Sequence, residues 1–264
     1  MSISPHTRDA RRTGWTLPDA LAFEWAEQID STSSELMRRV RDDLLDAPLL
    51  LAAGEQTAGR GRLGRSWHTA PGDALTMSLA WPLRSTLALD GLSLAVGAAL
   101  ALALNGVCGE QVVRLKWPND LLLAGRKLGG ILVESVALGP RRWVVVGVGL
   151  NLGLPRAVDG AAALQTVWPR TPRVAEVGGL CGTALHGALE RFAQHGFEPF
   201  RGPWCTLHAW QGLTVCALRR DEAGAEQLVA RGQASGVDAR GALLLECAGG
   251  TVRIATADTS LRLC

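Results

Sequence analysis

Apolar residues recur at helical spacing in three parts of the chain, which predicts three helices. The first covers residues 30–44 and starts at a capping residue, Asp30, Ser31 or Thr32. Its other expected features are Glu35 as the N3 partner of the cap and a buried face of Leu36, Val40 and Leu44. The second helix is an Ala- and Leu-rich run over residues 89–107, and the third covers residues 172–196.

Shorter apolar runs between turn residues predict strands. In the first part of the chain they cover residues 48–55, 74–82, 111–118, 119–138 and 141–153, and the fourth is a hairpin turning at Ala124-Gly125. After Trp210 the runs become short, at residues 213–219, 226–237, 241–247 and 251–257. Four or five short strands within about 50 residues predict a small SH3-like β-barrel. We therefore expect a large domain at residues 1–212, with a flexible lead-in at 1–18, and a small one at 213–264.

Composition limits the function classes. The 27 basic and 25 acidic residues give a net charge of +2, too balanced for a protein that binds nucleic acid over its whole surface, so any anion site must be local. The apolar runs are too short for a membrane span, and the polar N-terminus lacks a signal-peptide core, so we expect a cytoplasmic protein. Six cysteines without a C-x-x-C pair indicate reduced thiols, with no disulfide framework and no zinc site: Cys108, Cys181, Cys205, Cys216, Cys247 and Cys264.

The segment GEQTAGRGRLGRSWH, residues 54–68, contains GRGRLG, which matches the G-x-G-x-x-G dinucleotide fingerprint. That fingerprint needs a helix directly after it and an acidic residue about 20 positions on. Pro71-Gly72 interrupts such a helix, and the region where the acidic residue is expected holds Arg84 instead. A Walker loop is also excluded, because no GK[ST] follows. Glycine lets the backbone approach a ligand and move, and arginine binds carboxylate or phosphate through two hydrogen bonds. The segment therefore predicts a flexible anion clamp, with Trp67 as an apolar lid or stacking face.

Three further segments carry polar residues or glycines in or beside strands. In KWPND, residues 116–120, a proline ends the strand and leaves Asn119 and Asp120 exposed. The same residues would also be found at an ordinary strand-to-turn junction. In RKLGGILVES, residues 126–135, Lys127 opens a strand, where a lone lysine usually faces solvent. The glycines of this strand and of GVGLN, residues 147–151, indicate a close neighbour on the backbone.

Taken in order, GRGRLGR, KWPND, K-x-GGIL-x-E and GVGLN resemble the motifs of the biotin–protein ligase family. The resemblance covers roughly residues 29–264 and includes a C-terminal Ser-Leu-Arg element ending at Arg262. It implies an α+β fold in which helices back a mixed β-sheet, as in class II aminoacyl-tRNA synthetases and lipoate ligases. It also implies that biotin and ATP, with Mg²⁺, form biotinyl-5′-AMP, from which biotin passes to one lysine of a biotin carboxyl carrier protein, typically of acetyl-CoA carboxylase.

The resemblance also implies roles for individual residues. Lys127 matches the lysine between the biotin carboxylate and the α-phosphate, Arg62 matches a phosphate contact, and Asp120 is a candidate to assist the carrier lysine or to bind a metal. The expected biotin contacts are Ser31, Thr32, Gln56, Gly59, Arg60, Arg62, Lys127 and Gly130. The expected adenylate contacts are Arg62, Arg65, Trp67, Asn119, Asn151 and Arg262. The chain departs from the family pattern at Ser33, where Asn is usual, and at Ala257-Asp258, where Gly-Glu is frequent.

Two other functions fit parts of the sequence. A lipoate or other acyl-acid ligase would use the same scaffold, and a nucleic-acid-binding protein would use the arginines of residues 59–65 and the small barrel. Residues 213–264 hold six arginines and six acidic residues, which disfavours nucleic acid. The roughly 28 residues before the Asp30 element are too few for a winged helix, so we expect a short form without operator binding. Many relatives dimerise, and a strand edge near residues 142–152 is the expected homodimer surface.

Overall fold

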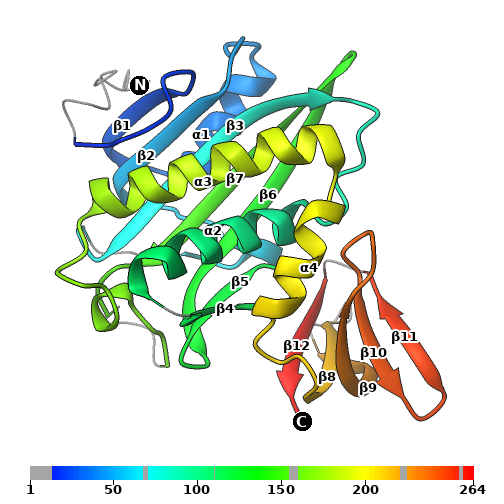
Figure 1. Ribbon diagram of the computed structural model, residues 1–264. Coiled ribbons are helices and arrows are strands. Elements are labelled where there is room, and N and C mark those ends of the chain that lie inside the picture. The colour runs from blue at the N-terminus through cyan, green and yellow to red at the C-terminus, as the bar shows by residue number, and fades with distance from the viewer. Residues whose placement is uncertain (1–13, 68–70, 110, 155–159, 221–224, 256–257) are drawn as a thin grey trace.

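Figure 1 shows the computed structural model, which describes residues 14–67, 71–109, 111–154, 160–220, 225–255 and 258–264. Most of the expected lead-in, residues 1–13, lies outside the described residues, as does Ala257. In the part of the lead-in that is described, Trp15 is buried, with its ring 4.7 Å from that of Phe23. None of the helices in the described ranges is long and apolar enough to cross a membrane.

A seven-stranded mixed sheet organises the larger part of the molecule, in the order β1-β2-β3-β7-β6-β5-β4. The strands are β1 (Ala22–Ile29), β2 (Leu49–Gln56), β3 (Ala74–Arg84), β4 (Val113–Lys116), β5 (Asp120–Leu123), β6 (Arg126–Leu138) and β7 (Arg141–Asn151). β1 runs parallel to β2, and all other neighbours are antiparallel, so the expected mixed sheet is confirmed. The expected hairpin is β5 and β6, which turn at Ala124 (φ 49°) and Gly125 (φ 74°).

Two features of this sheet differ from what the sequence predicts. Residues 20–29 are too mixed to predict an element, but most of them form β1, an edge strand whose single neighbour is β2. The strand edge expected near residues 142–152 is wrong. These residues form β7, whose two sides are paired with β3 and β6, so they offer no free edge for a homodimer.

Helices cover both faces of this sheet. They are α1 (Thr32–Arg41), α2 (Leu92–Cys108), α3 (Val174–His195) and α4 (Glu198–Leu207). α2 and α3 lie side by side across one face, and α1 packs against the other (Figure 1). β2 serves both faces because alternate residues of a strand point in opposite directions. Leu50 and Ala52 join the core under α2 and α3, and Leu49, Leu51 and Ala53 join the core under α1.

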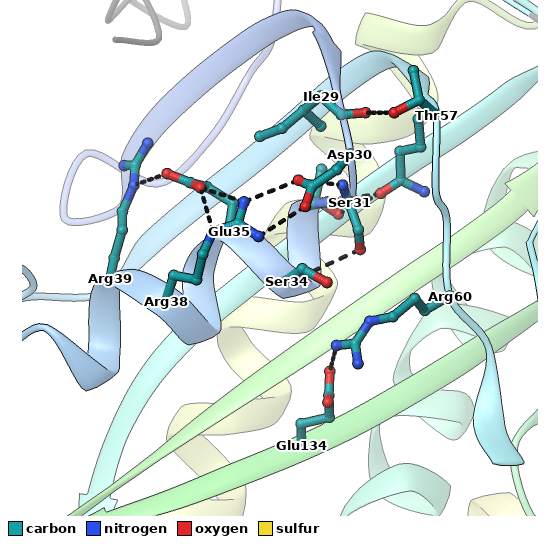
Figure 2. A network of polar contacts seen from close by, with 12 residues as sticks. Ile29, Asp30, Ser31, Ser34, Glu35, Arg38, Arg39, Thr57, Arg60 and Glu134 are labelled. Atoms are coloured by element: carbon teal, nitrogen blue, oxygen red, sulfur yellow. Dashed lines mark hydrogen bonds and ion pairs between the residues drawn. The ribbon is translucent and has the colours of Figure 1, made fainter. Parts of the chain in front are cut away.

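The start of α1 is capped by Ser31, whose Oγ accepts a hydrogen bond from the Ser34 N–H at 3.3 Å. Ser34 is therefore the N3 residue, and the expected N3 role of Glu35 is wrong. Glu35 instead pairs with Arg38 and Arg39, at 2.7 and 2.8 Å (Figure 2). Local ion pairs thus replace the capping box.

The end of α1 comes earlier than the apolar pattern predicts. The helix ends at Arg41, so Leu44 lies beyond it and is 67% exposed, whereas Leu36 and Val40 are buried as expected. The backbone leaves the helix through Asp43, which has a positive φ of 54°. The expected burial of Leu44 is therefore wrong.

A second, five-stranded antiparallel sheet follows α4, in the order β11-β10-β9-β8-β12. Its strands are β8 (Thr214–Arg220), β9 (Glu226–Val237), β10 (Leu243–Cys247), β11 (Gly250–Ile254) and β12 (Thr259–Leu263). The turn before β10 docks on the larger part, where the Trp117 indole donates to the Gly241 carbonyl at 3.0 Å and Arg240 pairs with Asp90 at 3.1 Å. A Cβ on Gly241 would lie 2.8 Å from the Gly91 backbone, so the turn depends on glycine.

Two of the six cysteines form a disulfide, Cys216–Cys264, so the expectation of reduced thiols throughout is wrong for this pair. The cause is tertiary. β12 runs antiparallel to β8 with Arg262 opposite Cys216, which brings the last residue back beside a cysteine 48 positions earlier. Cys108, Cys181, Cys205 and Cys247 are free thiols.

Candidate active site

A cavity lies where four segments far apart in the sequence meet. They are the N-terminus of α1, the loop at residues 57–67 (the Gly/Arg loop), the turn between β4 and β5, and the start of β12. Strands β3, β6 and β7 contribute the sheet side of the cavity, including Ser78, Gly130 and Gly149. The cavity is therefore shared by the two sheets, because β12 belongs to the C-terminal one.

A chain of buried hydroxyl groups lines part of the cavity. The backbone N–H of Thr32 donates to Gln56 Oε1 at 2.8 Å, so this oxygen is an acceptor, and the Thr32 hydroxyl donates to it at 3.0 Å. Because Thr32 has one hydroxyl hydrogen, Ser78 must donate to Thr32 at 2.7 Å, and Ser33 to Ser78 at 2.9 Å. Ser33 fits because position 147 is glycine: a Cβ there would lie 2.5 Å from the Ser33 Oγ.

The stem of the Gly/Arg loop is fixed beside α1. The N–H groups of Thr57 and Ala58 donate to the carbonyls of Ile29 and Asp30, at 2.9 and 2.8 Å. Asp30 is itself held by Arg38 at 2.8 Å, and this hydrogen bond lowers the pKa of the Asp30 carboxyl (Figure 2). The loop and the first residues of α1 therefore share one anchor.

Beyond its stem the loop folds back on itself. The Gly61 N–H donates to the Arg65 carbonyl at 2.7 Å, and the Trp67 N–H donates to the Gly59 carbonyl at 2.9 Å. Leu63, at the tip, adopts a left-handed conformation (φ 56°, ψ 36°) and is 57% exposed. Non-glycine residues adopt that conformation at a cost, and such sites cluster at ligand clamps.

Positive charge dominates the cavity. Five cationic side chains line it: Arg60, Arg62, Arg65, Lys116 and Lys127. Among the described lining residues Asp120 is the one carboxylate, and it accepts from Lys127 Nζ at 2.7 Å, with Lys116 Nζ 4.0 Å away. Glu134, which does not line the cavity, pairs with Arg60 at 2.5 Å. Two carboxylates cannot neutralise five cations, so the cavity is built for an anion.

Two of these cations are short of counter-charge. Burial lowers the pKa of Lys116, and Lys127 nearby adds to this, although Asp120 acts the other way. Burial likewise lowers the pKa of Arg62. Arg62 donates to Asn119 Oδ1 at 2.6 Å, but its buried Nη2 has no hydrogen-bond partner among the described residues. An anionic ligand would satisfy both groups.

The glycines of β7 have the close neighbours that the sequence indicates. A Cβ on Gly149 would lie 2.5 Å from the Trp67 indole, and Gly147 faces Ser33. The Trp67 ring therefore rests against the backbone of β7. Its buried Nε1 has no acceptor among the described residues.

The structure brings most of the expected site residues to this one cavity: Ser31, Thr32, Gln56, Arg60, Arg62, Arg65, Trp67, Asn119, Asp120, Lys127 and Gly130. The remaining three do not line it. Gly59 packs behind the loop, where a Cβ would meet the Trp67 carbonyl at 2.4 Å. Asn151 is buried and donates to the Ala162 carbonyl at 3.0 Å, and Arg262 pairs with Glu226 at 2.7 Å.

Sequence reasoning overlooked several residues that line the cavity. Lys116 stands in KWPND, whose lysine was given no role, and Ser78 with Thr76 interrupts an apolar strand with hydroxyls at every second position, a usable signal. Thr259, Ser260 and Leu261, at the start of β12, line the cavity, whereas Arg262, the next residue, pairs with Glu226 instead.

Known proteins are similar to this chain over most of its length. Residues 25–151 match the Biotin/lipoate A/B protein ligase family, and residues 223–262 match the Biotin protein ligase C terminal domain. The Bifunctional ligase/repressor BirA of Escherichia coli (strain K12) is 35% identical over 255 residues, covering 88% of this chain and 76% of BirA. The Biotin--[acetyl-CoA-carboxylase] ligase of Paracoccus denitrificans is 34% identical over 227 residues, covering 82% and 90%.

A solved structure extends the likeness to the fold. The biotin protein ligase from Aquifex aeolicus in complex with biotin and ATP has a TM-score of 0.75 with this chain at 25% identity, covering 92% of this chain and 99% of that one. Sequence and fold therefore agree over both sheets, and this chain belongs to the biotin protein ligase family.

Proposed function

We propose that the protein is an ATP-dependent biotin–protein ligase. A carboxylate oxygen of biotin attacks the α-phosphorus of ATP, the bond from that phosphorus to the β-bridging oxygen breaks, and pyrophosphate leaves. The ε-amine of a carrier-protein lysine then attacks the acyl carbon of biotinyl-5′-AMP, forming an amide and releasing AMP. The relative from Paracoccus denitrificans carries the name of this activity.

The observation that carries the proposal is the excess of cations in the cavity, five against one carboxylate. The biotin carboxylate and the α-phosphate are both anionic and repel each other. Fixed positive charges offset that repulsion and stabilise the charge that develops on the phosphoryl oxygens. Since the protein forms no covalent bond to either reactant, the rest of the catalysis comes from holding biotin and ATP in position.

Lys127, Arg62 and Asp120 are the residues to which we assign the chemistry. Lys127 would turn from Asp120 toward the biotin carboxylate and the α-phosphate, and Arg62 would use its unpartnered Nη2 on the phosphate. Once Lys127 has moved, Asp120 is free to take a proton from the carrier lysine. Arg65, Trp67 and Asn119 would hold the adenylate.

Biotin itself needs an apolar wall and a few polar groups. Leu132 and the Trp67 ring supply apolar surface on the cavity face of the sheet. Ser31 and the Thr32–Ser78–Ser33 hydroxyl chain beside Gln56 supply polar groups for the ureido ring. Arg60 and Gly130 line the same space. We assign Gly59, Asn151 and Arg262 supporting positions outside the cavity.

Mg²⁺ fits this site as an ion that binds together with the phosphates of ATP. The described residues hold no group of three metal-binding side chains, and Asp120 is the carboxylate within the cavity. Mg²⁺ commonly binds through one or two carboxylates together with substrate phosphates, and it would supply further positive charge there.

Further aspects of the organisation are also proposals. We propose domains at residues 1–212 and 213–264, the second an SH3-like unit, which the five short antiparallel strands support. We also propose that the protein does not bind operator DNA, in keeping with the balanced charge of residues 213–264. A homodimer would need a surface other than β7, such as edge strand β1, and light scattering would detect it.

The test is biotin-dependent pyrophosphate release by the purified protein with ATP and Mg²⁺, followed by labelling of one lysine on an apo-carrier domain. Lipoate, added in place of biotin and as a competitor, separates the acyl-acid alternative that the same family includes. Pyrophosphate release that depends on lipoate and not on biotin would refute the proposed substrate. A gel shift that withstands added salt would refute the absence of DNA binding.

A further inference from the structure

The Gly/Arg loop is held at its stem and at its tip by different kinds of contact. Its stem is fixed by backbone hydrogen bonds to Ile29 and Asp30. Across the cavity, residues 60–66 reach the opposite wall through two side-chain contacts that the structure describes. These are Arg62 to Asn119 at 2.6 Å and Arg60 to Glu134 at 2.5 Å.

The two contacts differ in what surrounds them. Arg62 is half-buried in the cavity, and its unpartnered Nη2 marks it as a group that will change partners when an anion binds. Glu134 does not line the cavity, and its contact with Arg60 lies at the rim, with the side chains 25% and 43% exposed. The Arg60–Glu134 pair can therefore persist while a ligand occupies the cavity.

Strand β6 places Glu134 at this rim. Gly130, Leu132 and Glu134 are two residues apart and so point to the same face of the sheet. Gly130 and Leu132 line the cavity, and Glu134 is the next residue of that face. Its backbone pairs with Val145 of β7, in the interior of the sheet, so the carboxylate stands on a rigid element opposite a loop (Figure 2).

We propose that Glu134 is a positioning residue, which holds Arg60 and thereby keeps the Gly/Arg loop closed over the acyl-adenylate until the carrier lysine arrives. This inference rests on the proposed function, since a mixed anhydride needs protection from water between the two half-reactions. Glu134 touches neither reactant. Its contribution is to the lifetime of the bound intermediate.

The expected effect is modest, because a partly exposed ion pair contributes at most about 1 kcal/mol, a factor of roughly five in an equilibrium. Glu134→Gln should therefore speed the loss of bound biotinyl-5′-AMP roughly two- to five-fold. The release rate of the parent protein should also rise with salt, since screening weakens a rim ion pair, and that of Glu134→Gln should rise less.

The experiment forms the adenylate on the intact protein from radiolabelled biotin, ATP and Mg²⁺. It removes free ligand by rapid gel filtration and follows release. The parent protein is compared with Glu134→Gln, Arg60→Gln and the double variant. We expect each single change to speed release, and Glu134→Gln to have no further effect once Arg60 is replaced. Glu198→Gln, which removes the exposed pair of Glu198 with Arg201 on α4, is the matched control and should release like the parent.

Three results would overturn the role of Glu134. They are an unchanged release rate in Glu134→Gln, a slower one, as expected if Glu134 merely withholds Arg60 from the ligand, or an effect of Glu134→Gln that persists in the Arg60→Gln background. Failure of the parent protein to form any adenylate would instead count against the proposed function. The two failures are thus distinguishable.

Discussion

At the scale of single residues, the surroundings of a side chain decide whether it can act in the site, and Lys127 is the example. Lys127 is 46% exposed, as a lone lysine at the start of a strand often is. Its backbone is nevertheless fixed, since its carbonyl accepts from the Ala162 N–H at 2.8 Å, and its ammonium is 2.7 Å from Asp120. Lys127 therefore lies at the cavity paired with Asp120, and it can exchange this partner for an anion.

Replacement of Lys127 by Ala should lower the rate of adenylate formation about 10²- to 10³-fold, because a fixed charge that stabilises the transition state is lost. Biotin-dependent pyrophosphate release measures this, and thermal unfolding should show that the fold survives. Arg126→Ala is the matched control, since Arg126 is the neighbouring cation and does not line the cavity. An activity of Lys127→Ala within a few-fold of the parent would remove Lys127 from the site.

At the scale of elements, glycines decide how closely the layers approach. Helix α3 carries Gly178 where a Cβ would lie 2.1 Å from the Trp15 ring, so the first described residues of the chain pack directly on its backbone. Gly187 on the same helix is exposed, and the described atoms leave the space around its Cβ position open to 4 Å. Within α3, glycine at position 178 therefore permits close packing, whereas glycine at position 187 has no packing role among the described residues.

We predict opposite effects of alanine at these two positions. Gly178→Ala should destabilise the protein by about 1–3 kcal/mol, because the added methyl group must displace Trp15. Gly187→Ala should stabilise it by about 0.4–1 kcal/mol, because alanine restricts the unfolded chain and favours the helix. Urea unfolding of both variants beside the parent measures the difference. Equal shifts of the same sign would contradict this account of α3.

At the scale of the whole molecule, the connection between the two sheets also touches the active site. His208 is fully buried at the end of α4 and stacks on Trp204 with ring centroids 4.7 Å apart. The next residue donates its N–H to the Leu115 carbonyl at 2.8 Å, and Trp210 then lies against Lys116, 4.8 Å from ammonium to ring centroid. The connection thus anchors β4 where β4 supplies a cation to the cavity.

Burial lowers the pKa of His208 to about 4, from 6.5 in an exposed chain. The folded state therefore favours the neutral ring, and below pH 6.5 the unfolded state binds the proton more readily. The stability associated with His208 should be fully present above pH 6.5 and decline as pH falls toward 4, by up to about 3 kcal/mol. Urea unfolding of the parent and of His208→Phe at pH 7.5, 6.0 and 5.0 tests this. The parent should lose stability faster than the variant, and parallel pH profiles would contradict the assignment.

Local patterns in the sequence were enough to predict most helices and strands, the turn at Ala124-Gly125 and the motifs that supply Lys127 and Arg62. Caps, periodicity and turn chemistry act within a few residues, so one segment carries the information. For the same reason the motif resemblance indicated the family, and 11 of the 14 site residues that it named line the cavity.

Other features depend on which segments become neighbours. Thr32 meets Ser78 across 46 positions, Arg60 meets Glu134 across 74, and Trp117 meets Gly241 across 124. The same holds for the unpredicted edge strand β1, the outward pairing of Arg262, the burial of Asn151 and the disulfide to the chain end. The order of the strands and the docking of the second sheet bring these groups together. No local sequence pattern predicts the strand order or the docking, because both result from packing all the apolar faces of the molecule together.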